Sequence, residues 1–263
     1  MQGGGYSGRP VDDLYVQRDQ PPGVPPLHLT GERTLPDVPE ENYWFRRHLA
    51  VYGWIAQRIH GRRVVDLACG EGYGTAVLAR TAASVVGVDA NAEAFEHARL
   101  KYTGPRVRFE RNMVELWRGD VDCVVFLQTI EHVQDPDAML EHVRDLIGPA
   151  GVAYVSTPNV LTLAPRGQPR SGNPWHLVEY RPEEFRALCA RHFARVDMLG
   201  VFHARRLRVH ELALKAGWDR LHKALRLTRP FYDRFTPAIS TSDFALKARH
   251  LDRALDLLVV LRP

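Results

Sequence analysis

The sequence predicts an α/β fold in which helices cover both faces of a mostly parallel β-sheet. Three observations support this prediction. Short apolar runs alternate with segments of helical periodicity through most of the chain. The runs are apolar almost throughout, as strands buried on both faces require. A glycine-rich turn follows the first run and leads into a helical pattern, which is typical of a strand–turn–helix unit.

The expected elements follow one another in a regular order. A helix over about residues 41–59 has apolar side chains at helical spacing and leads into the first strand. Apolar runs predict strands at Val64–Leu67, Val85–Asp89, Val107–Glu110, Val121–Leu127, Val152–Ser156 and Arg195–Phe202, and a last strand within Leu251–Leu261. Helical spacing predicts helices at Thr75–Ala82, Ala92–Tyr102, Asp137–Leu146 and Pro182–His192.

Three further segments do not fit the alternation. Residues 1–27 are rich in glycine and proline and predict a flexible tail, which leaves 28–263 as one domain. Residues 157–180 follow the fifth strand, at the sheet edge where open α/β sheets bind ligands, and are predicted to form a substrate-side loop. Residues 203–243 predict a helical insertion that covers the site or builds an interface. Its leucines are expected to face the core or a dimer partner, not a membrane.

Composition excludes several classes of protein. No apolar run is long enough to span a membrane, and the N-terminus lacks the apolar segment of a signal peptide. Cys69, Cys123 and Cys189 lie far apart and predict buried free thiols in a reducing compartment, so we expect a cytoplasmic protein. The net charge is +4, but basic residues are scattered among acids, which argues against nucleic-acid substrates.

The glycine-rich turn indicates the kind of cofactor. Its glycines Gly70, Gly72 and Gly74 are spaced too closely for a dinucleotide motif, and Asp66 precedes them. A carboxylate beside the turn would repel a pyrophosphate but could hold an ammonium group. Asp89, at the end of the second strand, can accept hydrogen bonds from both ribose hydroxyls. These features favour S-adenosylmethionine over NAD.

The residues from Asp66 to Gly74 resemble the first motif of class I S-adenosylmethionine-dependent methyltransferases. The resemblance implies a Rossmann-like sheet of seven strands, with the last strand antiparallel and a helical insertion before it. It also implies that Asp89 binds the ribose and that Asn112 and Met113 meet the adenine, although Asn112 could instead cap a helix. The implied cofactor contacts are Arg47, Asp66, Ala68, Gly70, Gly72, Asp89, Ala90, Asn112, Met113 and Gln128.

Two closer likenesses concern the acceptor. Residues 122–132 resemble the segment after the fourth strand of ubiquinone-type O-methyltransferases. Residues 31–33, 41–48, 156–159 and 173–176 and the C-terminus resemble actinobacterial methyltransferases linked to methylated polysaccharide synthesis. This second likeness implies O-methylation of a sugar or saccharide hydroxyl, in polysaccharide biosynthesis. It also implies that Arg47 meets the cofactor carboxylate, unless Arg47 is only a surface charge.

The acceptor hydroxyl must lose a proton, and the sequence offers two candidate bases. His132 follows the fourth strand beside Glu131, and His176 lies in the Pro-rich loop with Glu179. Glu131 and His132 could alternatively bind Mg²⁺, because related enzymes have Glu-x-x-Glu-His at this place, although here Gln128 replaces the first acid. A third interpretation is that Glu131 caps a helix and His132 packs under the cofactor.

Other functions remain open at the level of sequence. The acceptor could be a quinone precursor, an acyl thioester or another natural product, and the protein could bind the cofactor without catalysis. Trp175 and Tyr180 flank His176 and favour a saccharide, because aromatic faces stack on sugar rings. A homodimer is possible, since the helical insertion could form an interface.

Overall fold

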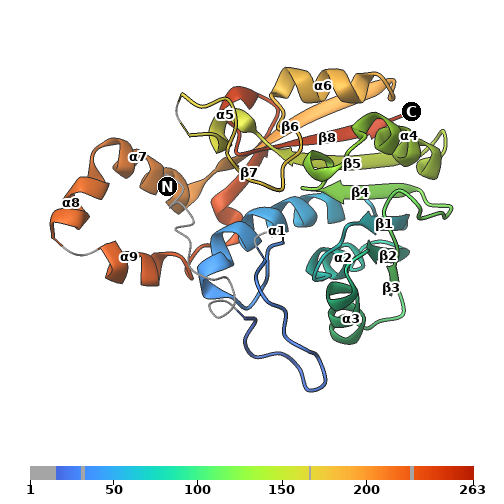
Figure 1. Cartoon of the computed structure of the whole chain (residues 1–263), viewed down its shortest axis with the longest axis horizontal. Helices are drawn as coiled ribbons and strands as arrows, with labels where there is room; N and C mark the ends of the chain where they lie inside the picture. The colour runs from blue at the N-terminus through green and yellow to red at the C-terminus, as the bar shows by residue number, and fades with distance from the viewer. Residues whose placement is uncertain (1–15, 31–32, 166, 226–227) are drawn as a thin grey trace.

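The computed structural model describes residues 16–30, 33–165, 167–225 and 228–263, and it contains one eight-stranded sheet. The strand order is β3-β2-β1-β4-β5-β8-β6-β7 (Figure 1). The first five strands run parallel, whereas β8 is antiparallel to both β5 and β6. The strands are β1 (Arg63–Leu67), β2 (Ser84–Asp89), β3 (Val107–Arg111), β4 (Cys123–Leu127), β5 (Val152–Pro158), β6 (Arg195–His203), β7 (Phe244–Lys247) and β8 (Asp256–Arg262).

Nine α-helices connect these strands within the described residues. They are α1 (Asn42–Ala56), α2 (Tyr73–Leu78), α3 (Ala92–Lys101), α4 (Pro136–Ile147), α5 (Val160–Leu163), α6 (Pro182–Ala190), α7 (Arg205–Lys215), α8 (Trp218–Ala224) and α9 (Thr228–Phe235). Short 3₁₀ turns are η2 (Pro39–Glu41), η3 (Ile130–His132), η4 (Thr241–Asp243) and η5 (Leu251–Arg253). Figure 1 shows α4 and α6 on one face of the sheet and α1 and α2 on the other.

The architecture confirms the predicted α/β fold with an antiparallel C-terminal strand. The sheet has one strand more than predicted, because Phe244–Lys247 returns from the insertion and pairs with the outer edge of β6. This strand could not be predicted, since a four-residue strand at a sheet edge lacks the apolar run of a central strand.

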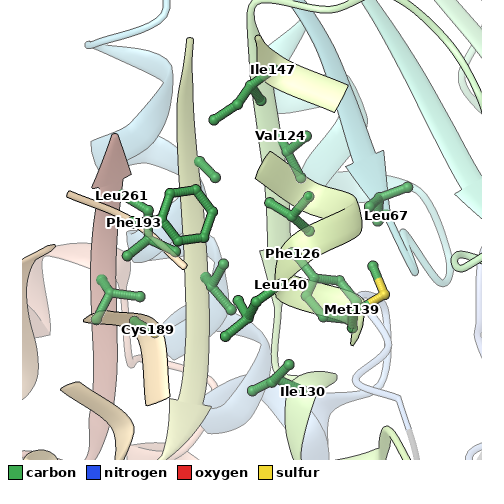
Figure 2. Close-up of a cluster of buried hydrophobic side chains, with 14 of the residues drawn as sticks. Leu67, Val124, Phe126, Ile130, Met139, Leu140, Ile147, Cys189, Phe193 and Leu261 are labelled. Atoms are coloured by element: carbon green, nitrogen blue, oxygen red, sulfur yellow. The ribbon is translucent and has the colours of Figure 1, made fainter. Parts of the chain in front are cut away.

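Two apolar cores lie on opposite faces of the sheet. On one face α4 and α6 pack over the central strands, and Figure 2 shows Phe126 of β4 close to Met139 and Leu140 of α4. On the other face α1 and α2 cover the same strands, with Tyr52 and Ile55 fully or nearly fully buried. Both cores include alternate residues of one strand, which explains why β4 is apolar at every position. The three cysteines are buried free thiols, as predicted.

The N-terminal segment differs from the predicted tail. Residues 1–15 of that tail lie outside the described residues, but residues 16–27 fold back and form a strap together with residues 28–30 and 33–38. Leu27 packs with Leu35 and Val38 in a small buried cluster, and Val16 forms a β-bridge with His28. The glycines and prolines of this segment therefore form turns of a packed strap, since Val24 and Leu27 bury apolar surface.

The helical insertion forms α7, α8 and α9, as predicted, and Figure 1 shows it extending away from the sheet. Its leucines were expected to face the core or a dimer partner, and only some of them face the core. Leu207 is buried, but Leu212, Leu221 and Leu225 are more than half exposed. No helix among the described residues is long and apolar enough to cross a membrane.

Candidate active site

The turn between β1 and α2 adopts the strained backbone that its sequence predicts. Ala68 and Gly72 have positive φ angles of 57° and 95°. A left-handed conformation costs an alanine roughly 1 kcal/mol, so a glycine at position 68 would relieve this strain. Gly74 permits a close approach instead, because a Cβ there would lie 2.2 Å from the Tyr52 ring. Tyr52 of α1 therefore packs directly on the turn.

Asp89 joins the end of β2 to this turn. Its carboxylate accepts hydrogen bonds from the backbone N–H of Gly70 at 2.8 Å and of Asn91 at 2.9 Å. These bonds fix the carboxylate at the wall of a cavity, where its remaining lone pairs can accept from a diol.

Asp66 lies beneath the turn and is fully buried. It accepts hydrogen bonds from the hydroxyls of Thr75 at 2.7 Å and Tyr52 at 3.1 Å. Burial raises its pKa to about 7, although these hydrogen bonds favour the carboxylate. Asp66 does not line the cavity, so the structure places it as a support for the turn.

A cavity of about 540 Å³ opens at the carboxyl ends of β1, β2, β4 and β5. Of the predicted cofactor contacts, Ala68, Gly70, Asp89, Ala90 and Gln128 line it. The predicted base His132 and part of the 157–180 loop line it as well. The full lining is Arg33, Thr34, His48, Val51, Tyr52, Ala68, Cys69, Gly70, Glu71, Tyr73, Asp89, Ala90, Asn91, Leu127, Gln128, Thr129, His132, Ser156, Pro174, Trp175, Leu177 and Asp256.

Glu71 is a lining residue that the sequence analysis missed. Its buried carboxylate accepts hydrogen bonds from Lys101 at 2.7 Å, from the Tyr102 hydroxyl at 2.7 Å and from Gln17 at 3.1 Å. The His97 ring contacts the same carboxylate at 2.9 Å and the Pro25 carbonyl oxygen at 2.7 Å. Glu71 thus ties the N-terminal strap and α3 to the glycine turn.

Arg47 and Asp256 form a buried ion pair beside the cavity. The guanidinium donates two hydrogen bonds to the carboxylate and lies over the Trp44 ring, with its carbon 4.9 Å from the centroid. Arg47 is not part of the described lining. The alternative interpretation of Arg47 as a surface charge is wrong, because its side chain is buried.

Arg33, Thr34 and His48 bring the strap and α1 to the cavity, and none of them was predicted as a site residue. His48 Nδ1 lies 3.2 Å from the Thr34 hydroxyl. Burial lowers the pKa of His48 to about 4, so this ring is neutral at physiological pH. Among the described lining residues Arg33 alone supplies an arginine or lysine charge.

The two predicted adenine contacts lie outside the lining. The Asn112 backbone N–H donates to the Asp89 carbonyl oxygen at 3.2 Å, and the Met113 side chain is half exposed. Asn112 is not the N-cap of any helix in the described chain, so that alternative is wrong. Both residues follow β3, next to Asp89, and their contact with the cofactor stays a prediction.

Gln128 begins the segment that contains the predicted base His132. Its backbone is left-handed, with φ of 53°, and its N–H donates to the Ser156 carbonyl oxygen. The side-chain amide also donates to the Ser156 hydroxyl at 3.0 Å. A non-glycine residue held in this conformation is typical of functional sites. It turns the chain so that η3 follows directly with Glu131 and His132.

Glu131, His132 and His176 meet in one cluster. One ligand atom from each lies within 4.8 Å of the others. The two rings are 5.1 Å apart and nearly perpendicular. The sequence suggested His132 and His176 as separate candidates, and the structure brings them together because backbone N–H groups of Leu177 and Val178 donate to the Glu131 carbonyl oxygen.

Hydrogen bonds set the tautomers of the two histidines. His132 Nδ1 lies 2.8 Å from the Trp175 carbonyl oxygen, which can only accept, so the neutral ring carries its proton on Nδ1 and is basic at Nε2. His176 Nδ1 donates to Glu179 at 2.8 Å, and its Nε2 accepts from the Asn173 amide at 3.0 Å. Both ring nitrogens of His176 are therefore engaged by Glu179 and Asn173, and which histidine acts as the base stays a prediction.

Glu131 is buried, with 1% of its surface exposed. Burial raises its pKa to about 8, and its Oε2 atom has no hydrogen-bond partner within the described residues. Such an atom costs free energy unless a proton or a bound group compensates it. The helix-cap interpretation is not supported, because no α-helix begins at Glu131.

Comparisons with known proteins agree with this geometry. A methyltransferase domain family matches residues 40–212, more than half of the chain. A probable S-adenosylmethionine-dependent methyltransferase of Mycolicibacterium smegmatis is 38% identical over 247 residues, which cover 89% of this chain and 94% of the relative. The chain belongs to the S-adenosylmethionine-dependent methyltransferases. A similar relative from Mycobacterium tuberculosis is 36% identical and covers 89% of each chain.

More distant relatives of this methyltransferase share only part of its length or only its fold. The ubiquinone biosynthesis O-methyltransferase of Shewanella pealeana is 33% identical over 107 residues, 38% of this chain and 45% of the relative. A solved methyltransferase structure from Thermotoga maritima superimposes with a TM-score of 0.57 at 14% identity, covering 85% of this chain and 94% of that one. The second likeness supports the fold alone.

Proposed function

We propose that the methyltransferase methylates a hydroxyl of a sugar or saccharide, with S-adenosylmethionine as donor. The main observation behind this proposal is the position of Trp175. Its side chain is half exposed at the cavity, and its carbonyl oxygen holds the His132 ring. An exposed indole face beside a base suits a sugar ring, which stacks its apolar C–H face on aromatic groups.

The residues around the glycine turn fit a phosphate-free nucleoside. The carboxylates of Glu71 and Asp89 line the cavity at the turn, and they would repel a pyrophosphate. Asp89 is held to accept from ribose hydroxyls, and Arg33 can pair with the amino-acid carboxylate of the donor. We prefer Arg33 to Arg47 for this role, because Asp256 already pairs with Arg47.

In this proposal His132 is the general base that activates the acceptor hydroxyl. The bound donor supplies an activated methyl group on a sulfonium. His132 Nε2 accepts the proton of the acceptor hydroxyl, while the Trp175 carbonyl oxygen stabilises the charged ring through Nδ1–H. Alignment of the acceptor in the cavity lowers the barrier further, since the reaction is an in-line displacement.

A cation at the cluster is the second candidate for activating the hydroxyl. Glu131, His132 and His176 would hold it, and it would lower the pKa of a bound hydroxyl. The partnerless Glu131 Oε2 supports such a role. Two imidazoles and one carboxylate suit Zn²⁺ or Mn²⁺ better than the predicted Mg²⁺, which prefers oxygen ligands.

Calorimetry can test the cation directly. The chelator-treated enzyme is titrated with Zn²⁺, Mn²⁺ and Mg²⁺, and His176→Ala and His192→Ala serve as cluster and control variants. We expect Zn²⁺ or Mn²⁺ to bind the wild type and the control but not His176→Ala. Binding that survives His176→Ala, or tight binding of Mg²⁺ alone, would contradict this cation site.

Product analysis tests the acceptor. The enzyme is incubated with donor carrying a deuterated methyl group and with three acceptor panels: oligosaccharides, catechol-type quinone precursors and acyl thioesters. We expect label in the saccharides, on oxygen, and loss of this transfer in Trp175→Ala while cofactor affinity is retained. Label confined to the phenols or thioesters would overturn the saccharide assignment.

A further inference from the structure

The helical insertion carries a surface that the proposed function does not use. None of its residues belongs to the lining of the cavity as described above, so its role as a cover of the site is not supported. The exposed side chains of this insertion include Arg208, Val209 and Leu212 of α7, Leu221 of α8, and Leu225, which caps the C-terminus of α8. We name these five residues the outer face of the insertion.

The outer face is apolar at its centre. Val209 is 67% exposed, and Leu212, Leu221 and Leu225 are 55%, 51% and 57% exposed. Residues three and four apart lie on the same side of a helix, so Val209 and Leu212 are adjacent, as are Leu221 and Leu225. Pairs of adjacent apolar side chains at such exposure mark an interaction site more often than scattered single ones do.

The inner packing of the insertion does not need these side chains. Behind α7 the His210 ring packs on Phe235 of α9, with centroids 4.6 Å apart, and Phe231 stacks on Phe235 at 5.2 Å. Leu207 of α7 is buried on the same inner side. The outer face is therefore a surplus apolar surface on helices that are already held together from within.

The insertion also concentrates the positive charge of the chain. Residues 205–235 contain nine arginines and lysines and three acids, a net charge of +6, whereas the whole chain carries +4. The remaining residues therefore sum to −2. Arg205, Arg208 and Lys215 are exposed on α7 around the apolar centre. Basic side chains around exposed leucines are typical of helices that lie in a membrane interface.

We propose that the outer face docks on an anionic lipid surface. Positive charge and apolar surface then act together, because headgroups neutralise the arginines while leucines enter the interface. A second copy of the chain fits less well. A symmetric dimer through this face would bring two copies of residues 205–235, each with a net charge of +6, against each other, and like charges repel.

Vesicle co-sedimentation tests this proposal with the full chain. Vesicles of phosphatidylcholine alone are compared with vesicles in which about one third of the lipid is phosphatidylglycerol. We expect binding only to the anionic vesicles, weakened about tenfold or more by high salt. Leu212→Ser with Leu221→Ser and Leu225→Ser should abolish it, and so should Arg208→Glu with Lys215→Glu.

Matched controls keep the result interpretable. Leu116→Ser changes a leucine that is 63% exposed outside the insertion, and it should leave vesicle binding intact. Circular dichroism and cofactor affinity verify that each variant is folded, and they report on the proposed function separately. The proposal is overturned if the wild type stays in the supernatant, if Leu116→Ser loses binding equally, or if light scattering shows a dimer that the triple leucine variant dissociates.

Discussion

At Asp66 the burial of a carboxyl group opposes its ionisation. Its ordinary pKa of 3.8 rises to about 7 in the folded chain. Between these values the folded state holds a proton that the unfolded state has released, so the free energy of unfolding falls as the pH rises through this window and levels off above it.

Asp66→Asn should remove this pH dependence. We expect the wild type to lose roughly 2–4 kcal/mol relative to the variant between about pH 4 and about pH 7. Denaturant unfolding of both proteins at several pH values measures the difference, and subtracting the two curves cancels other titrating groups such as Glu131. Parallel curves would show that Asp66 titrates normally in the folded protein.

Substitution of Arg33 should lower the affinity for the cofactor product, whereas substitution of Arg47 should lower the stability of the fold. Arg33→Ala removes a charge from the cavity, so we expect affinity for S-adenosylhomocysteine to fall about tenfold or more while stability is retained. Arg47→Ala leaves the buried Asp256 carboxylate without its partner and should cost about 3–5 kcal/mol of stability. Calorimetry and chemical unfolding of both variants report the two quantities, and the reverse pattern would restore Arg47 as the carboxylate contact.

His132→Ala should lower kcat by roughly 10²–10⁴-fold, because it removes the group that accepts the hydroxyl proton. Affinity for S-adenosylhomocysteine should change little. His192→Ala is the control, since His192 contacts Asp137 away from the cluster. Steady-state kinetics with an identified acceptor measures the effect, and full activity of His132→Ala would remove this residue from the mechanism.

At the scale of the elements, replacing either of two glycines by alanine should change the stability of the protein, in opposite directions. A Cβ at Gly74 of α2 would clash with the Tyr52 ring, so Gly74→Ala should destabilise by about 1–3 kcal/mol. Gly53 lies within α1, and a Cβ there meets nothing within 4 Å, so Gly53→Ala should stabilise by about 0.5–1 kcal/mol. Thermal unfolding of both variants decides this, and an equal effect of either sign would refute the packing of α1 on the turn.

An element could be predicted when a short stretch of sequence marks it, and could not when only distant contacts define it. The turn from Asp66 to Gly74 and the acid Asp89 could be found because one strand–turn–helix unit carries them all. The edge strand β7 could not be found, since only its pairing with β6 defines it. Likewise the strap was mistaken for a tail, because its burial depends on contacts with distant residues, His97 of α3 and Glu71 of the glycine turn.

At the scale of the whole molecule, the site is assembled from segments that no motif connects. Arg33 comes from the strap, His48 from α1, His132 from the end of β4 and Asp256 from β8. Five of the ten predicted cofactor contacts line the cavity, and four of these five belong to the glycine turn and the end of β2, where the sequence signal is local. The sequence left the acceptor side as separate candidates, because the proximity of His132 and His176 is set only by the packing of the 157–180 loop on η3.

A crystal structure with S-adenosylhomocysteine tests the central claim most directly. We predict that the ribose hydroxyls donate to the Asp89 carboxylate and that the sulfur faces the part of the cavity lined by His132 and Trp175. A nucleoside bound away from Asp89, or a sulfur that points away from His132, would contradict this account.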